Sequence, residues 1–390
     1  MRAIRVEKLI VLKAGCRDDE CCNLVARLGG QVVKRIPFVG AVAVSRLSEE
    51  AVRALATHRD VETVEDDLPV YALGAAAGLW GRTDVKARRP KLCWPEPRWP
   101  DRGRTGRRLA PRIPWGVRRI GAPAVWPESR GRGVTIAIVD TGIDLTHPDL
   151  QERVVGGFSS VGGTCNDENG HGTHVAGIAA ASGVDGGVLG VAPQANLLAV
   201  KVLDARGAGT LTSLLEGLAW VAKVRAPIVN LSLGSPIPSR LVRRAVTRLA
   251  EAGALVIAAA GNMGPEEGSV GYPAGYPCVT AVGALTPGGE VAPFSSRGEG
   301  IDLVAPGARV LSTWLGGEYR RLDGTSMAAP HAAGAAALLW PFLGDAHAVR
   351  RALLNGASPL CDWPRSAQGW GALSAVSAVA WALGQESHGL

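Results

Sequence analysis

Apolar residues from residue 114 onward fall into short continuous runs that are separated by stretches with helical spacing. The apolar runs cover 134–140, 195–204, 227–233, 254–260 and 278–285. Continuous runs of this kind are typical of strands that are buried on both faces. The segments 209–224 and 239–252 between them repeat apolar residues with a helical period. This alternation predicts an α/β domain with a doubly wound, mainly parallel sheet.

The first 73 residues show a different order of elements. Strands are predicted at 8–13, 31–36, 40–46 and 61–66, and helices at 18–28 and 49–58. Ser48 stands where it can accept a hydrogen bond from the first turn of the second helix, and the acidic pair that follows it complements the helix dipole. The order β-α-β-β-α-β predicts a small ferredoxin-like α+β unit.

The segment 74–113 has no apolar periodicity and is dense in Gly, Pro and Arg, so we predict that it is a linker. The expected organisation is therefore a small unit at 1–73, a linker at 74–113 and a large domain at 114–390. The linker holds eleven Lys and Arg against three Asp and Glu, a net charge of +8, whereas the whole chain carries +7.

This distribution of charge bears on nucleic-acid binding. Arginine and tryptophan in the linker are residue types that bind single-stranded nucleic acid by phosphate contacts and stacking. A nucleic-acid-binding protein is therefore one alternative. The rest of the chain has a net charge of −1, so we do not expect nucleic acid to be the main partner.

The sequence shows little sign of a membrane-spanning segment or of a secretory signal. No stretch approaches the roughly 18 consecutive apolar residues of a membrane span, so we expect no membrane partner. The apolar run near the N-terminus covers only residues 9–12, whereas a secretory signal needs about 7 to 15. The seven cysteines have neither metal-site spacing nor the density of a disulfide scaffold, which favours free thiols.

Three residues stand at predicted strand ends and helix starts, where open parallel sheets usually bind their ligands. Asp140 ends an apolar run, and His171 and Ser326 each open a stretch of small residues. Each has an ordinary structural explanation on its own: a turn residue, a structural histidine and a helix cap. Together they supply the nucleophile, the base and the orienting carboxylate of a serine hydrolase. Their chain order, Asp-His-Ser, differs from that of the α/β-hydrolases and of the chymotrypsin type.

Five motifs extend this match: VDTGID, NGHGTHVAG, NLSLGS, AAAGN and GTSMAAPHAAG. Their set and order resemble those of the subtilisin-like serine proteases, over residues 114 to about 384. The resemblance implies an endopeptidase that acts on protein or peptide substrates. Ser326 would attack the carbonyl carbon, His171 would act as base and then as acid, and Asp140 would orient His171. Asn262 would stabilise the oxyanion.

The resemblance also implies how a substrate binds. Ser232, Leu233 and Gly234 match the strand that pairs with the substrate backbone, a mode of binding that largely ignores sequence. The primary pocket would be lined by residues 258–260, which include Ala259, and by Gly234 and Gly271, and Gly261 is a further predicted substrate-binding residue. Small walls without a buried charge predict broad specificity with a preference for a large apolar side chain before the scissile bond.

A structural calcium ion and no organic cofactor are the expectations for bound groups. Asp149 matches a calcium ligand of the family, and the segment 182–190 keeps the length of its calcium loop. Two positions depart from the family pattern: Val184 stands where an Asn is usual, and Pro111 stands where a Gln is frequent. Asp185 is the residue that could compensate for them.

Residues 1–73 resemble the inhibitory propeptide of the same family, chiefly through VETVEDDLPVYAL. This implies a self-processing zymogen with residues 1–73 as an intramolecular inhibitor. Leu73 would occupy the primary pocket and Val70 the fourth subsite. We expect a monomer that is secreted or held at the cell envelope, because a propeptide usually accompanies export. The alternative to export is an intracellular protein. The alternative to an active enzyme is a catalytically inactive scaffold or inhibitor with the same fold.

Overall fold

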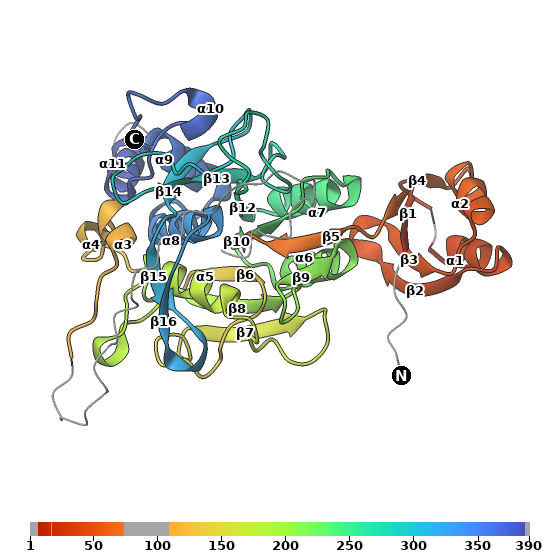
Figure 1. The fold of residues 1–390 in the computed structure, drawn as a ribbon, viewed down its shortest axis with the longest axis horizontal. Coiled ribbons are helices and arrows are strands. Elements are labelled where there is room, and N and C mark those ends of the chain that lie inside the picture. Colours follow the sequence, from red (N-terminus) through yellow and green to blue (C-terminus); the bar gives the residue numbers. More distant parts are fainter. Residues whose placement is uncertain (1–6, 17, 74–108, 387–390) are drawn as a thin grey trace, which may run out of the picture.

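The computed structural model describes residues 7–16, 18–73 and 109–386, and Figure 1 shows their arrangement. Most of the predicted linker, 74–108, lies outside these ranges, as does Cys93; the six other cysteines have free thiols. Residues 109–113 are described and lie along the loop at 183–189, where Arg112 pairs with Val188. The end of the predicted linker is thus part of the large domain. None of the helices in the described ranges is long and apolar enough to cross a membrane.

The N-terminal unit has the predicted order of elements. They are β1 (Lys8–Leu12), α1 (Asp18–Arg27), β2 (Gln31–Ile36), β3 (Ala41–Ser45), α2 (Glu49–Ala56) and β4 (Val61–Asp66). The strands form an antiparallel sheet in the order β2-β3-β1-β4. Ser48 caps α2 as predicted, because its hydroxyl accepts from Ala51 N at 3.1 Å. A 3-10 turn at Pro37–Val39 joins β2 to β3.

The large domain is built on a seven-stranded sheet. Its strands are β6 (Thr135–Asp140), β7 (Val154–Ser159), β8 (Asn196–Lys201), β10 (Ile228–Leu231), β12 (Leu255–Ala259), β13 (Thr280–Leu285) and β14 (Leu303–Pro306). Their order is β14-β13-β12-β10-β6-β8-β7, and every pair is parallel. The predicted α/β fold class is confirmed. The sequence did not predict β7 and β14, the two edge strands, because Gly156 and Gly157 interrupt β7 and Pro306 ends the short β14.

Helices cover both faces of this sheet. They are α5 (His171–Ala180) and α8 (Thr325–Leu343) on one face, and α6 (Leu211–Val224) and α7 (Arg240–Glu251) on the other. The side chains of β6 alternate between these layers: Ile136 and Ile138 belong to the first core, and Ala137 and Val139 to the second. Both faces are buried, and this is why the strand is a continuous apolar run.

Short elements complete the domain. The helices are α3 (Trp115–Arg119), α4 (Ala122–Val125), α9 (Ala346–Asn355), α10 (Arg365–Gln368) and α11 (Ala375–Glu386). The strands are β5 (Pro69–Ala72), β9 (Ala208–Thr210), β11 (Leu233–Gly234), β15 (Val310–Thr313) and β16 (Tyr319–Leu322). Of these, β5 belongs to the N-terminal unit of residues 1–73, where it follows β4, and it runs between β11 and β9 of the large domain.

Candidate active site

Asp140, His171 and Ser326 lie at the carboxyl-terminal edge of the parallel sheet. Asp140 is the last residue of β6, His171 the first residue of α5 and Ser326 the second residue of α8. The chain reaches this edge from three separate elements, so residues far apart in sequence meet there. This is the edge at which open α/β sheets bind their ligands.

The contact between Asp140 and His171 is short and buried. Asp140 Oδ1 lies 2.7 Å from His171 Nδ1, and Asp140 is fully buried. Burial lowers the pKa of His171, but the charge and hydrogen bond of Asp140, together with the charge of Asp167, outweigh it and raise this pKa above its usual value. Asp140 therefore favours the protonated imidazolium and fixes the ring so that Nε2 faces away from the carboxylate.

The start of α5 is held by three residues that the sequence reasoning did not single out. The first three amides of the helix donate to side-chain oxygens of Asn169, Thr141 and Asp167, at 3.2, 2.9 and 3.0 Å respectively. The N-cap residue is a glycine and has no side chain to serve this purpose. An available signal was the polar run NDEN directly before the helix, since such residues favour helix starts. These contacts fix the position of His171.

Ser326 is fully buried, and its hydroxyl donates to the carbonyl oxygen of Ser232 at 2.9 Å. The Ser232 hydroxyl in turn donates to the carbonyl of Ser326 at 3.0 Å. Within the described ranges, His171 Nε2 has no hydrogen-bond partner. The predicted pairing of nucleophile and base is thus not formed in this arrangement. Hydrogen bonds between catalytic groups often tighten only when substrate is bound.

Asn262 is oriented by Thr325, the residue before Ser326. Its Oδ1 accepts from both the amide and the hydroxyl of Thr325, each at 2.9 Å. The amide nitrogen of Asn262 must then point the other way, and it donates to the carbonyl oxygen of Leu73 at 3.0 Å. The sequence reasoning missed Thr325, although this residue precedes the predicted nucleophile directly.

A segment of the N-terminal unit occupies the predicted substrate strand. In β5, Ala72 pairs with Leu233 and Tyr71 with Gly234 in antiparallel register. The amide of Leu73 donates to the carbonyl of Ser232 at 3.2 Å. Gly234 is needed here because a Cβ at this position would lie 2.9 Å from the backbone carbonyl oxygen of Tyr272 and 3.3 Å from a methyl group of Leu73.

Three of the predicted substrate-binding residues lie at the end of β12 or bond to the residue that follows it: Ala259, Gly261 and Gly271. Ala259 ends β12 and belongs to the same buried cluster as Leu73, which is 4% exposed. The amide of Gly261 donates to the hydroxyl of Thr325 at 3.1 Å, and Gly271 bonds to the carbonyl of Ala260 at 2.9 Å. Their contact with a substrate stays a prediction.

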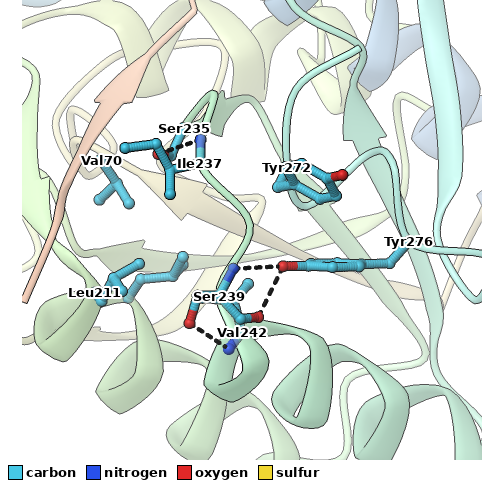
Figure 2. Close-up of a pocket in the computed structure, with 9 residues that line it drawn as sticks. Val70, Leu211, Ser235, Ile237, Ser239, Val242, Tyr272 and Tyr276 are labelled. Atoms are coloured by element: carbon cyan, nitrogen blue, oxygen red, sulfur yellow. Dashed lines mark hydrogen bonds between the residues drawn. The ribbon is translucent and has the colours of Figure 1, made fainter. Parts of the chain in front are cut away.

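Val70 of β5 is one of the residues that line an apolar cavity, and Figure 2 shows these side chains. Tyr276 closes one side, where its hydroxyl accepts from Ser239 N at 2.9 Å and donates to Ser239 O at 2.8 Å. Burial raises the pKa of Tyr276 to about 12, so this phenol stays protonated. The lining residues are Val70, Leu211, Leu214, Ser235, Ile237, Ser239, Val242, Tyr272 and Tyr276.

The N-terminal unit is tied to the large domain through the starts of two helices. Glu65 accepts from the amide of Arg240 at 3.1 Å and from the hydroxyl of Ser239 at 2.7 Å, at the start of α7. Asp67 accepts from the amide of Thr212 at 2.8 Å, at the start of α6. Carboxylates stabilise helix N-termini because they meet unpaired N–H groups and the positive end of the helix dipole.

Polar contacts continue along the same interface. Arg244 forms an ion pair with Glu62 at 2.5 Å and donates to the carbonyl of Val39 at 2.8 Å, and Lys34 pairs with Glu216 at 2.5 Å. Alternate side chains of the small sheet also take part. Leu9 and Val11 belong to the buried cluster beneath α6 and α7, whereas Ile10 and Leu12 pack with α1 and α2.

The predicted calcium ligands Asp149 and Asp185 do not converge. Asp149 is fully buried, whereas Asp185 is exposed and has a left-handed backbone (φ 45°). Both oxygens of Asp149 already accept hydrogen bonds from protein donors. Within the ranges described above, no group of three or more His, Cys, Asp or Glu could hold a metal ion. Calcium prefers six to eight oxygen ligands, so these residues do not fit it.

Comparison with known sequences matches this chain to one family of proteases. The model of the subtilase family matches residues 131–371, more than half of the chain. An alkaline protease of Shouchella clausii is 50% identical over 234 residues, which cover 59% of this chain and 60% of that protein. Subtilisin Savinase of Lederbergia lenta is 51% identical over 230 residues, 58% of this chain and 84% of the relative. Subtilisin E of Bacillus subtilis (strain 168) is 38% identical over 323 residues, 81% and 74% of the two chains.

Proposed function

Because this chain belongs to the subtilase family, we propose that it is a serine endopeptidase that hydrolyses peptide bonds through Asp140, His171 and Ser326. The observation that carries the proposal is the hydrogen bond from Asn262 to the carbonyl oxygen of Leu73, 3.0 Å long. The end of the N-terminal unit thus lies against the active site as the acyl half of a peptide substrate would.

The proposed mechanism assigns one step to each group. In the presence of a substrate, the Ser326 hydroxyl turns from the carbonyl of Ser232 to His171 Nε2, which takes its proton as the oxygen attacks the carbonyl carbon. Asn262 and the backbone amide of Ser326 stabilise the oxyanion. His171 then protonates the departing amine, and Asp140 stabilises the imidazolium that exists between these steps. Water then takes the place of the amine: His171 removes its proton as its oxygen attacks the acyl carbon, and returns the proton to the Ser326 oxygen as the bond to the acyl group breaks.

We also propose that the chain is a zymogen and that residues 1–73 act as its intramolecular inhibitor. Three kinds of contact support this: β5 takes up the substrate strand, Glu65 and Asp67 cap the starts of α7 and α6, and the two parts share an apolar cluster. A substrate cannot pair with Leu233 and Gly234 while β5 is there. Activity therefore requires cleavage after the N-terminal unit and its release.

The proposed specificity follows from the side chains that β5 presents. Leu73 is buried beside Gly234, and Val70 is buried in an apolar cluster with Leu211 and Val242, beside the cavity of Figure 2. We therefore propose a preference for a large apolar residue before the scissile bond and for an apolar residue three positions earlier. The pairing of main chains is indifferent to the other side chains, so specificity should be broad.

The test is a comparison of the full-length precursor with its Ser326→Ala variant over time, with N-terminal sequencing of the products. We expect the parent to shorten through cuts after Leu73 or within residues 74–113, and the variant to keep its full length. A fluorophosphonate probe should label the processed parent at Ser326. A folded variant that is processed at the parent's rate would contradict self-processing. Failure of the probe to label a correctly processed parent would favour an inactive scaffold.

A further inference from the structure

The carboxylate of Asp149 is enclosed by a loop that satisfies it with protein donors alone. Asp149 Oδ1 accepts from the amide of Val184 at 2.6 Å. Oδ2 accepts from the amide of Val188 at 2.8 Å and from the hydroxyl of Tyr319 at 2.9 Å. A Cβ on Gly187 would lie 2.2 Å from Oδ1, so the loop closes directly on the carboxylate. Three donors supply the hydrogen bonds that a buried carboxylate needs.

A cation from another part of the chain lies at the same loop. Arg112 Nε donates to the carbonyl of Gly186 at 2.9 Å, and its guanidinium carbon lies 4.5 Å from the centroid of the Tyr319 ring. Tyr319 therefore contacts the cation with its ring and the carboxylate of Asp149 with its hydroxyl. The backbone of Arg112 adds two hydrogen bonds, to Gly187 O at 2.7 Å and from Leu189 N at 2.9 Å.

We propose that the guanidinium of Arg112 is the resident cation of this loop and that Asp149 binds no calcium. Charge and ligand number both support this assignment. One guanidinium balances one carboxylate, whereas a divalent ion added to the same two residues would leave an excess of positive charge. Val184 has no side-chain oxygen to offer, and the carbonyl of Gly186 already accepts from the cation. A calcium ion needs six to eight oxygens at about 2.3–2.6 Å.

The test uses the full chain with Ser326→Ala, which prevents self-digestion. Its thermal unfolding is followed with EDTA and with millimolar Ca²⁺, next to the same protein carrying Arg112→Gln. We expect the midpoint of the Ser326→Ala chain to differ by less than about 1 °C between the two conditions. Arg112→Gln should lower it by about 2 to 5 °C in both, the size expected for the loss of one or two half-buried interactions in a domain of this length. Arg351→Gln, a change on the exposed face of α9, is the matched control and should leave it unchanged.

The remaining outcomes depend on where any Ca²⁺ ion binds. A rise in the midpoint with Ca²⁺ that disappears in Asp149→Asn would overturn the proposal. A rise that persists in Asp149→Asn would place the ion elsewhere and leave the proposal standing. If Asp149→Asn does not fold, crystals of the Ser326→Ala chain soaked in Ca²⁺ give the same decision. An ion within about 2.6 Å of Asp149 refutes the assignment, and an ion-free carboxylate bound to Val184 and Val188 supports it.

Discussion

The side-chain amide of Asn262 donates to the carbonyl oxygen of Leu73 at 3.0 Å, and the opposite end of the same amide accepts two hydrogen bonds from Thr325. The donor that the proposed mechanism aims at the oxyanion is thus already fixed in direction before a reaction begins. A donor that needs no reorganisation stabilises developing charge at the least cost. Thr325 is therefore a positioning residue for Asn262.

Replacing Asn262 with Ala should lower kcat by about 10²- to 10³-fold and change KM little, because the lost hydrogen bond strengthens as the oxyanion forms. This range is the one established for an oxyanion-hole asparagine in a subtilisin, and we adopt it. Steady-state kinetics of the processed enzyme on a peptide substrate provide the measurement.

Two changes at Thr325 separate orientation from donation. Thr325→Val removes the hydroxyl that holds Asn262 and should cost part of the loss in kcat, whereas Thr325→Ser keeps the hydroxyl and should retain most of the activity. Equal kcat values for Asn262→Ala and the parent would show that another group stabilises the oxyanion.

Specificity for apolar residues can be tested with peptide anilides based on the sequence of β5. The anilide of Val-Tyr-Ala-Leu should be cleaved at least about 100-fold more efficiently than that of Val-Tyr-Ala-Asp, because an unpaired carboxylate would have to leave water for an apolar pocket. Changing the terminal Leu to Met conserves volume and should cost less than about tenfold. Comparable values of kcat/KM for the Leu and Asp substrates would refute the apolar pocket.

The sequence predicted the parts of this fold that are governed by local patterns. Continuous apolar runs identified the five inner strands of the large sheet, and Ser48 identified the start of α2. The edge strands β7 and β14 escaped because they are short or contain glycine, and burial there depends on neighbours that are distant in sequence. Periodicity alone carries no information about such neighbours.

The residues of the candidate site also differ in how far the sequence predicted them. Asp140 and His171 were predicted from motifs, and the structure places them in contact. Thr325 acts through tertiary hydrogen bonds to Asn262, which no spacing in the sequence reveals. Asp167 bonds locally to the start of α5, where the polar run NDEN was an available signal. The calcium expectation for Asp149 rested on loop length and on one matching carboxylate. The occupants of that loop come from residues 112 and 319, which lie far from it along the chain.

The carboxylates of Glu65 and Asp67, which accept from amides at the starts of α7 and α6, should control how long the N-terminal unit stays bound after cleavage. Loss of a side-chain cap costs about 0.5–2 kcal/mol, which corresponds to about 2- to 30-fold faster release. Glu65→Ala and Asp67→Ala should each shorten, by such a factor, the lag between the appearance of the cut product and the appearance of peptidase activity.

The neighbouring Asp66 provides the control for these changes. It is exposed and forms an ion pair with Lys8 within the N-terminal unit, so Asp66→Ala should leave the lag nearly unchanged. Glu65→Gln keeps an oxygen acceptor and should lie between the parent and Glu65→Ala. If replacement of each of the three acidic residues by Ala shortened the lag equally, the loss of negative charge, rather than the loss of hydrogen bonds at the helix starts, would explain the effect.

The pH dependence of activity should show the influence of a second buried carboxylate on His171. The proposed mechanism requires a neutral His171 as base, and Asp140 and Asp167 raise the pKa of His171 above the usual 6.5. Activity should therefore fall as the pH drops through a value above 6.5. Asp167→Asn removes one negative charge while its side-chain oxygen can still accept from the amide of Thr173. This change should lower the pKa of His171 and move the acid limb of kcat/KM to lower pH. Glu152 offers the control, because its side chain is 72% exposed and Glu152→Gln removes a charge that water screens. A limb that stays in place in Asp167→Asn while activity falls at every pH would assign Asp167 a purely structural role.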